Sequence, residues 1–195
     1  MYSLDTEPHD PLPDLSLEQL PQRLREAAAR VGWTTLMPVQ ARAIPYLLAS
    51  RNMMIQARTG SGKTGAFLLP MLERLDSKRN HCQALILVPT RELARQVWQE
   101  AETICGGAGF RTVAVYGGVG YGAQLDALRQ GAHIVVGTPG RVLDQLLKRA
   151  LSLDHLALLV LDEADRMLSM GFYPDMKHVQ SYLPKRAINT CMFSA

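Results

Sequence analysis

Short apolar runs alternate with helix-like segments along most of the chain. The apolar runs fall at 53–55, 84–88, 112–116, 133–137, 156–161 and 190–193. Most of them are apolar at successive positions, which is typical of strands covered on both faces. Helix-like segments lie between them at 66–69, 91–104, 122–129, 142–147, 165–170 and 174–183. This alternation predicts one α/β domain, with a mostly parallel β-sheet and helices on both faces.

Two further helices are expected before the first strand. Apolar residues at helical spacing predict one helix from about 17 to 31, with Pro21 in its first turn, where proline is tolerated. A second helix is expected at 38–48. The polar, proline-containing stretch 1–14 is expected to be a flexible leader, so that the folded domain covers 15–195.

A glycine-rich stretch between the first apolar run and the helix-forming run at 66–69 reads Gln-Ala-Arg-Thr-Gly-Ser-Gly-Lys-Thr at 56–64. A strand, a glycine loop and a helix in this order form the phosphate-binding P-loop. Lys63 can neutralise phosphate charge and the Thr64 hydroxyl can ligate Mg²⁺. Ala57 stands where the P-loop pattern has its first glycine. The stretch predicts a nucleoside triphosphate site; the alternative is a glycine-rich turn that ends in a solvated lysine.

Acidic residues follow the apolar run that ends at Leu161. A carboxylate held at the end of a strand beside a P-loop can contact the Mg²⁺ of the nucleotide. Asp162 is expected to do so, through water, and Glu163 to orient or deprotonate the attacking water. Together with Lys63 these residues are the expected catalytic set. The alternative is an acidic cap of the helix that follows.

The four residues 162–165 read Asp-Glu-Ala-Asp, and with them the chain resembles the first RecA-like domain of DEAD-box RNA helicases. The resemblance covers about 32–195. Residues 57–64 look like the family's motif I, in which alanine at the first position is usual. Other stretches look like the Q motif, motif Ia, the GG doublet, motif Ib and the start of motif III; they lie at 32–40, 89–94, 117–118, 138–141 and 194–195.

The resemblance implies ATP and Mg²⁺ as cofactors. Gln40 carries an amide donor and acceptor that can pair with the edge of adenine, although a surface glutamine is the alternative. Trp33 is expected near the base or, equally, in the core. No aromatic residue occurs between Tyr2 and Trp33, so Leu12 or Leu15 is expected in place of the family's upstream aromatic. The expected nucleotide-binding set is Trp33, Gln40, Ala57, Arg58, Thr59, Gly60, Ser61, Gly62, Lys63, Thr64 and Asp162.

The resemblance also implies RNA, single-stranded or in short duplexes, bound through its backbone. Loops and helix starts after apolar strands suit phosphate contacts, which read no bases. The expected RNA-binding set is Pro89, Thr90, Arg91, Gly117, Gly118, Thr138, Pro139, Gly140 and Arg141. Surface salt bridges are the alternative for the two arginines. Asp165, Ser194 and Ala195 are expected to couple the nucleotide site to RNA, through a hydrogen bond between Ser194 and Asp165.

Composition limits the remaining possibilities. The 195 residues are 47% hydrophobic and 20% charged with a net charge of +3, which fits a globular protein that tolerates an anionic partner. Three scattered cysteines, no signal pattern and no run of ~18 apolar residues indicate a cytoplasmic protein without a membrane span.

In this family a second RecA-like domain completes the site, and this chain is expected to lack it. The chain is therefore expected to be a monomeric lobe that is weakly active or inactive alone. Two rival functions remain: a RecA-like ATPase or helicase that acts on DNA, and a non-catalytic RNA- or protein-binding scaffold.

Overall fold

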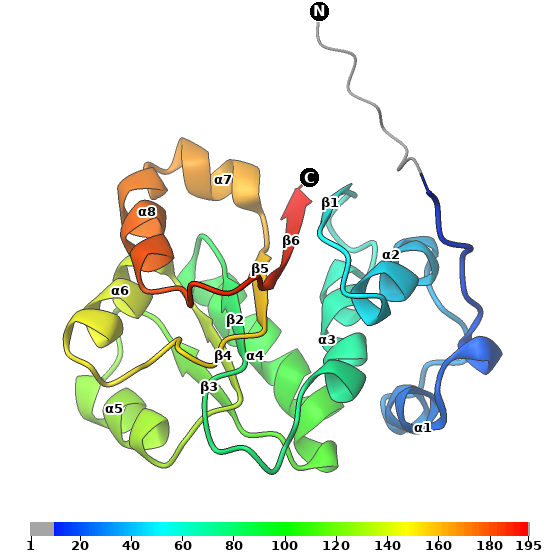
Figure 1. The fold of residues 1–195 in the computed structure, drawn as a ribbon, viewed down its shortest axis with the longest axis horizontal. Helices are drawn as coiled ribbons and strands as arrows, with labels where there is room; N and C mark the ends of the chain where they lie inside the picture. Colours follow the sequence, from blue (N-terminus) through cyan, green and yellow to red (C-terminus); the bar gives the residue numbers. More distant parts are fainter. Residues whose placement is uncertain (1–9, 195) are drawn as a thin grey trace, which may run out of the picture.

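The computed structural model describes residues 10–194 and has a single sheet of six parallel strands at its centre (Figure 1). Their order across the sheet is β1-β6-β5-β2-β4-β3. All pairs of neighbouring strands are parallel, so their carboxyl ends lie at one edge. The strands are β1 (Met53–Gln56), β2 (Ala84–Leu87), β3 (Thr112–Val115), β4 (Ile134–Gly137), β5 (Leu158–Leu161) and β6 (Asn189–Ser194).

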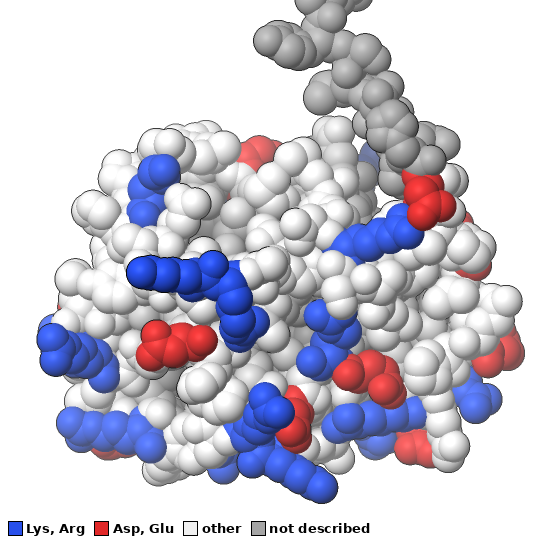
Figure 2. Space-filling model, in the orientation of Figure 1, with Lys and Arg blue, Asp and Glu red and all other residues white. Residues whose placement is uncertain are grey.

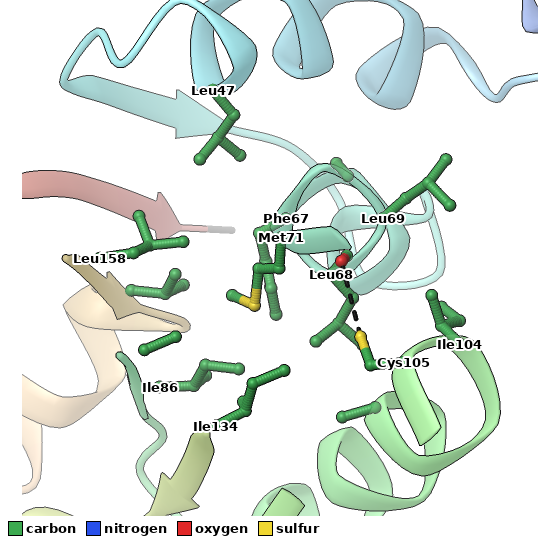
Figure 3. Packing of buried hydrophobic residues seen from close by; sticks show 14 of the residues in the cluster. Leu47, Phe67, Leu68, Leu69, Met71, Ile86, Ile104, Cys105, Ile134 and Leu158 are labelled. Atoms are coloured by element: carbon green, nitrogen blue, oxygen red, sulfur yellow. Dashed lines mark hydrogen bonds between the residues drawn. The ribbon is translucent and has the colours of Figure 1, made fainter. Parts of the chain in front are cut away.

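Helices cover both faces of the sheet. They are α1 (Gln22–Arg30), α2 (Pro38–Leu48), α3 (Lys63–Arg74), α4 (Arg91–Cys105), α5 (Tyr121–Arg129), α6 (Pro139–Leu147), α7 (Ala164–Ser169) and α8 (Tyr173–Ser181). Neighbouring residues of one strand enter different cores, because successive side chains point to opposite faces. Ile86 belongs to the core that includes buried residues of α1–α4 (Figure 3), whereas Leu85 belongs to the core that includes buried residues of α5–α8. The expected α/β fold with a parallel sheet is confirmed.

The single helix expected at 17–31 is wrong. A short 3₁₀ turn covers Leu17–Gln19, and α1 starts only at Gln22. Leu20 between them is extended, with ψ of 150°. The ring of Pro21 disfavours the helical conformation of the residue before it, so the helix cannot continue through this position. The other expected strands and helices begin and end within about three residues of the observed bounds, except that α3 continues to Arg74, beyond the expected run that ends at 69.

The segment that leads into the domain lies along α2. Asp10 forms a 2.7 Å ion pair with Arg51, and the Leu12 amide donates to the Tyr46 hydroxyl at 2.9 Å. The Leu15 amide donates to the Ala41 carbonyl at 3.1 Å. Residues 1–9 of the expected leader lie outside the described residues, and the boundary of the domain stays a prediction.

The helices that cover the sheet are short. The longest of those in the described residues, α4, has 15 residues, whereas a membrane-spanning helix needs ~20 mainly apolar ones. Among residues 10–194, no helix has the length and hydrophobicity that crossing a bilayer requires.

Candidate nucleotide site and nucleic-acid interface

The strand order divides the expected site residues into two neighbouring groups. In a parallel sheet, functional residues gather beyond the carboxyl ends of the strands. Strands β1, β5 and β6 form one half of the sheet and lead to the P-loop, Asp162 and Ser194. Strands β2, β4 and β3 form the other half and lead to the three stretches expected to contact RNA, 89–91, 138–141 and 117–118.

The P-loop has the conformation that its glycines predict. Gly60 and Gly62 have φ of 78° and 90°, in the left-handed region that favours glycine. A Cβ on Gly62 would stand 2.6 Å from the Met37 sulfur and 2.8 Å from Nε2 of Gln40. Glycine is therefore required at position 62 for two reasons, and α3 begins directly after it.

Lys63 lies at the junction of β1 and β6 and is 8% exposed. Its Nζ donates to the Ala57 carbonyl at 2.7 Å and to the Ser194 carbonyl at 3.2 Å. The Ala57 amide donates to the same Ser194 carbonyl at 3.0 Å. The Ser61 hydroxyl oxygen is buried and has no hydrogen-bond partner within residues 10–194. The loop therefore holds a cation and an unsatisfied hydroxyl that suit an anionic ligand.

A cavity of about 850 Å³ opens beside this loop, a size typical of small-molecule sites. Most of the expected nucleotide residues line it, and Ala57, Arg58 and Ser61 of the same loop do not. Leu12 and Leu15 do not line it either, and Leu15 packs against the core with α1–α4. The lining residues from the expected sets are Trp33, Gln40, Thr59, Gly60, Gly62, Lys63, Thr64, Thr90, Asp162 and Glu163.

Gln40 connects α2 to the P-loop. Its side-chain oxygen accepts from the Met37 amide at 2.9 Å, and its Nε2 donates to the Gly62 carbonyl at 3.2 Å. It is 3% exposed, which excludes a surface glutamine. The pairing of Gln40 with adenine stays a prediction, and the observed contacts give this residue a further role in holding the loop.

Asp162 and Glu163 follow β5 and have different surroundings. The Asp162 amide donates to the Leu87 carbonyl at 2.9 Å, and its side chain is nearly buried. Burial raises the pKa of Asp162 to about 6, although the charge of Lys63 opposes this rise. Glu163 has left-handed backbone angles, φ 51° and ψ 48°, and its carboxylate accepts from Arg166 at 3.0 Å. Such a conformation costs a non-glycine residue energy, and it is often found at functional sites.

One face of α4 also lines the cavity, which the sequence interpretation missed. Glu92, Gln96, Gln99, Glu100 and Thr103 recur at intervals of three and four residues, the spacing of one helical face. This polar stripe on a helix that begins at the carboxyl edge of the sheet was the pattern that could have revealed them. Burial raises the pKa of Glu100, and hydrogen bonding with Gln96 and Thr64 opposes the rise.

A second cavity, of about 360 Å³, lies on the other half of the sheet. It is lined by Arg91, Glu92, Arg95, Tyr116, Gly117, Gly118 and Val119. Gly118 has φ of 82°, and a side chain there would collide with the Arg91 guanidinium. The close approach brings two of the expected RNA-binding stretches together.

The third stretch, 138–141, starts α6 beside them. Val115 of β3 and Gly137 of β4 are register partners, and the Thr138 amide donates to the Val115 carbonyl at 3.1 Å. The two following loops therefore begin side by side. On the face seen in Figure 2, basic and acidic side chains are interspersed, so no broad basic surface marks a nucleic-acid interface there.

The expected coupling residues lie at the ends of β6 and β5. Asp165 is exposed in the first turn of α7, and Ser194 is the last described residue of β6. The hydrogen bond between them stays a prediction, and Ala195 lies outside the described residues.

Comparison with known proteins gives one consistent result. A model of the DEAD/DEAH box helicase family matches residues 37–195. The crystal structure of a DEAD box protein from the hyperthermophile Methanococcus jannaschii superposes with a TM-score of 0.87 at 37% identity, over 94% of this chain and 51% of that one. This similarity confirms the RecA-like fold class.

Curated relatives agree with this result. The chain is 46% identical to the ATP-dependent RNA helicase DeaD of Haemophilus influenzae over 90% of its own length and 29% of that protein. It is 49% identical to DeaD of Escherichia coli K12, over 87% of the chain and 27% of the relative. It is 44% identical to the ATP-dependent RNA helicase CshA of Listeria monocytogenes, over 90% and 34%. The chain thus spans about a third or less of the length of these relatives.

Proposed function

The chain belongs to the DEAD/DEAH box helicase family, and we propose that it is the ATP-binding lobe of an ATP-dependent RNA helicase. The observation that carries the proposal is the P-loop with Lys63 at the junction of β1 and β6, facing a cavity that Asp162 also lines. In this role the lobe couples ATP binding and hydrolysis to RNA binding and local opening of short duplexes.

The residues of the cavity fit a nucleotide with Mg²⁺. Among the described lining residues, the carboxylates Glu92, Glu100, Asp162 and Glu163 outnumber the cations Lys63 and Arg166. A triphosphate would be repelled by this set, whereas a divalent cation offsets the excess negative charge. Mg²⁺ supplies charge neutralisation between phosphate oxygens and carboxylate. Thr64 would ligate it directly and Asp162 through water, and both residues line the cavity.

Within this proposal, the residues of the site have different roles. The P-loop amides and Lys63 bind phosphates, Gln40 holds the loop and selects adenine, and Glu163 orients or deprotonates the attacking water. Efficient hydrolysis requires further positive charge on the transferred phosphate, which we assign to a second RecA-like lobe. Alone, the chain is a monomer that binds nucleotide and turns it over weakly.

RNA is the proposed partner on the other half of the sheet. The stretches 89–91, 117–118 and 138–141 adjoin one another, and two of them begin helices whose N-termini attract phosphates. These contacts suit backbone binding without base recognition. A cytoplasmic location is part of the proposal, supported by Cys82, Cys105 and Cys191, which are all unpaired thiols.

ATP turnover with and without single-stranded RNA tests the proposed function, with the Lys63→Ala variant as the blank. We expect turnover slightly above the blank. Vigorous RNA-stimulated turnover would show that no second lobe is needed. Competition between single-stranded RNA and DNA tests the partner, and preference for DNA would favour the rival DNA-directed ATPase. A scaffold function would be supported if Lys63→Ala left both nucleotide and RNA binding unchanged.

A further inference from the structure

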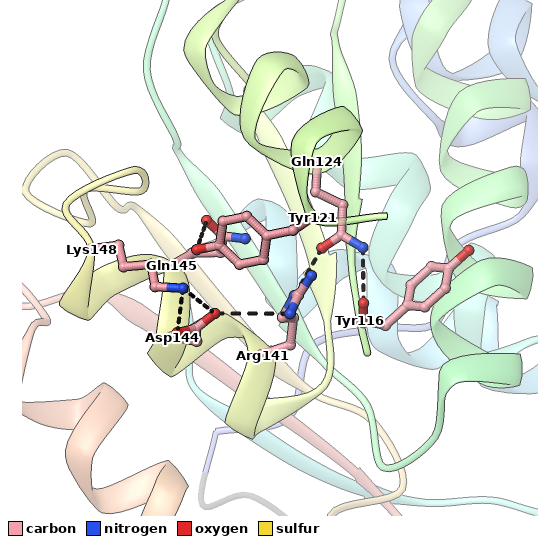
Figure 4. Close-up of polar contacts among 7 residues, drawn as sticks. All are labelled: Tyr116, Tyr121, Gln124, Arg141, Asp144, Gln145 and Lys148. Carbon is pink, nitrogen blue, oxygen red and sulfur yellow. Dashed lines mark hydrogen bonds and ion pairs between the residues drawn. The ribbon is translucent and has the colours of Figure 1, made fainter. Parts of the chain in front are cut away.

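A single buried glutamine connects two of the stretches proposed to contact RNA (Figure 4). Gln124 of α5 is 7% exposed. Its Nε2 donates to the Tyr116 carbonyl at 2.8 Å, and its Oε1 accepts from Nε of Arg141 at 3.3 Å. Tyr116 directly precedes the glycine pair 117–118, and Arg141 lies in the first turn of α6. One side-chain amide therefore contacts both segments.

Tyr121 of α5 contacts the same guanidinium with its ring. Cζ of Arg141 lies 4.3 Å from the ring centroid and Nζ of Lys148 lies 4.0 Å from it. The Tyr121 hydroxyl donates to the completely buried Gln145 side chain at 3.3 Å, which fixes the ring (Figure 4). Asp144 lies between the two cations, 3.9 Å from Arg141 and 3.3 Å from Lys148. Cation–π contacts of this kind stabilise a cation modestly at exposed sites and more strongly at desolvated ones.

These contacts restrict the conformation of Arg141 without burying it. Its side chain is 19% exposed, so the guanidinium can still reach a ligand. A free arginine side chain loses considerable rotamer freedom when it binds phosphate, and a side chain that is already ordered loses less. Gln124 restricts the loop before Gly117 in the same way, through the Tyr116 carbonyl.

We propose that Gln124 is a positioning residue for RNA binding, which holds Arg141 and the 116–118 loop at a fixed separation so that both contact one nucleic-acid backbone. Tyr121 supports Arg141 because its ring packs against the guanidinium. The inference rests on the proposed function, because it assumes RNA binding at these stretches. A glutamine suits this position because its amide offers a donor and an acceptor at once.

The alternative role for Gln124 is packing alone, since it lies beside the buried Leu128 on the inner face of α5. Gln124→Met separates the two roles, because methionine keeps the length and volume of the side chain and removes both hydrogen bonds. Gln130→Met is the matched control, on an exposed glutamine at the C-terminal end of the same helix.

The first readout needs no RNA. Arginine Nε–H resonances of the ¹⁵N-labelled chain are recorded, and that of Arg141 is assigned by its loss in Arg141→Lys. We expect Gln124→Met to shift the Arg141 resonance and to speed its exchange with water, and Gln130→Met to leave it unchanged. An Arg141 resonance that is the same in Gln124→Met would overturn the positioning role.

The second readout is the affinity for a fluorescent single-stranded oligoribonucleotide at low salt. We expect Gln124→Met to weaken binding about fivefold, in line with the loss of one or two hydrogen bonds. In the Arg141→Ala background the same change should weaken binding less, because its main partner is absent. Equal losses in both backgrounds would contradict the inference. Nucleotide affinity should be unchanged in Gln124→Met.

Tyr121 variants provide an independent test, which also serves if Gln124→Met does not fold. Tyr121→Phe keeps the ring and loses only the hydrogen bond to Gln145, so it should lower RNA affinity less than Tyr121→Leu, which should also shift the Arg141 resonance. Equal RNA affinity of Tyr121→Leu and the unmodified chain would overturn the support by Tyr121. RNA binding that does not depend on Arg141 at all would instead overturn the proposed RNA interface.

Discussion

The indole of Trp33 lies over Gly65 in the first turn of α3 and occupies the space that a side chain at position 65 would need. A Cβ on Gly65 would stand 2.8 Å from Cζ2 of Trp33 and 2.7 Å from Nε2 of Gln40. Trp33 and Gly65 both line the nucleotide cavity. The pair therefore determines how closely the segment after α1 packs on the helix that begins at the P-loop.

This relationship predicts a stability change of unusual sign. Replacing a helical glycine by alanine normally stabilises by ~1 kcal/mol, whereas overfilling a packed site costs ~1–3 kcal/mol. We expect the second effect to exceed the first, so Gly65→Ala should lower the free energy of unfolding measured in urea. In a Trp33→Leu background only the contact with Gln40 remains, so the same change should destabilise less. An equal loss of stability in both backgrounds would contradict the proposed contact with Trp33.

Asp162 predicts a pH-dependent stability. Its pKa is about 6 in the folded chain, against 3.8 for an ordinary aspartate. Between these two pH values the folded chain holds a proton that the unfolded chain releases, so the free energy of unfolding falls as the pH rises from about 4 to about 6. Asp162→Asn should remove this fall in the free energy of unfolding, because asparagine does not titrate.

The Asn variant should therefore be more stable than the unmodified chain at pH 7.5, by at most roughly 3 kcal/mol, and the difference should vanish below about pH 4. Urea unfolding in the presence of EDTA, repeated over a series of pH values, measures this difference in the free energy of unfolding. Equal stability of the two proteins at every pH would contradict the assigned burial cost.

Glu163 should act in hydrolysis and not in binding. A glutamine at this position is similar in size but cannot take up a proton, so Glu163→Gln should remove residual single-turnover hydrolysis. Nucleotide affinity should remain, because the Glu163 carboxylate contacts Arg166 and not the P-loop lysine. Glu73→Gln, at an exposed position on α3, is the matched control. Loss of nucleotide binding in Glu163→Gln would show that its role was assigned wrongly.

Local sequence patterns were sufficient for most elements and for the residues that the structure places at the centre of the candidate site. The P-loop could be predicted because its glycines, Lys63 and flanking strand and helix are contiguous. Asp162 was equally accessible, since a carboxylate directly after an apolar strand needs no knowledge of the rest of the fold. The break at Pro21 was missed because the apolar spacing of 17–31 was given more weight than the restriction on the residue before proline.

Contacts between distant segments could not be predicted. The order of the strands decides that Ser194 meets Lys63 and that Tyr116 approaches Arg141, and no local pattern contains that order. The same holds for Gln124, whose two partners are 8 and 17 residues away. Gln40 shows a further limit: its sequence surroundings do not reveal that it is buried against Gly62.

The most direct test of the nucleotide site is a titration with a fluorescent adenine nucleotide in Mg²⁺, of the unmodified chain and of Lys63→Ala. The exposed Lys78→Ala serves as the matched control. We expect saturable binding by the unmodified chain and by Lys78→Ala, at least about tenfold weaker binding by Lys63→Ala, and a similar loss in EDTA. Equal affinity of all three proteins, with or without Mg²⁺, would contradict the assignment of this loop as the phosphate site.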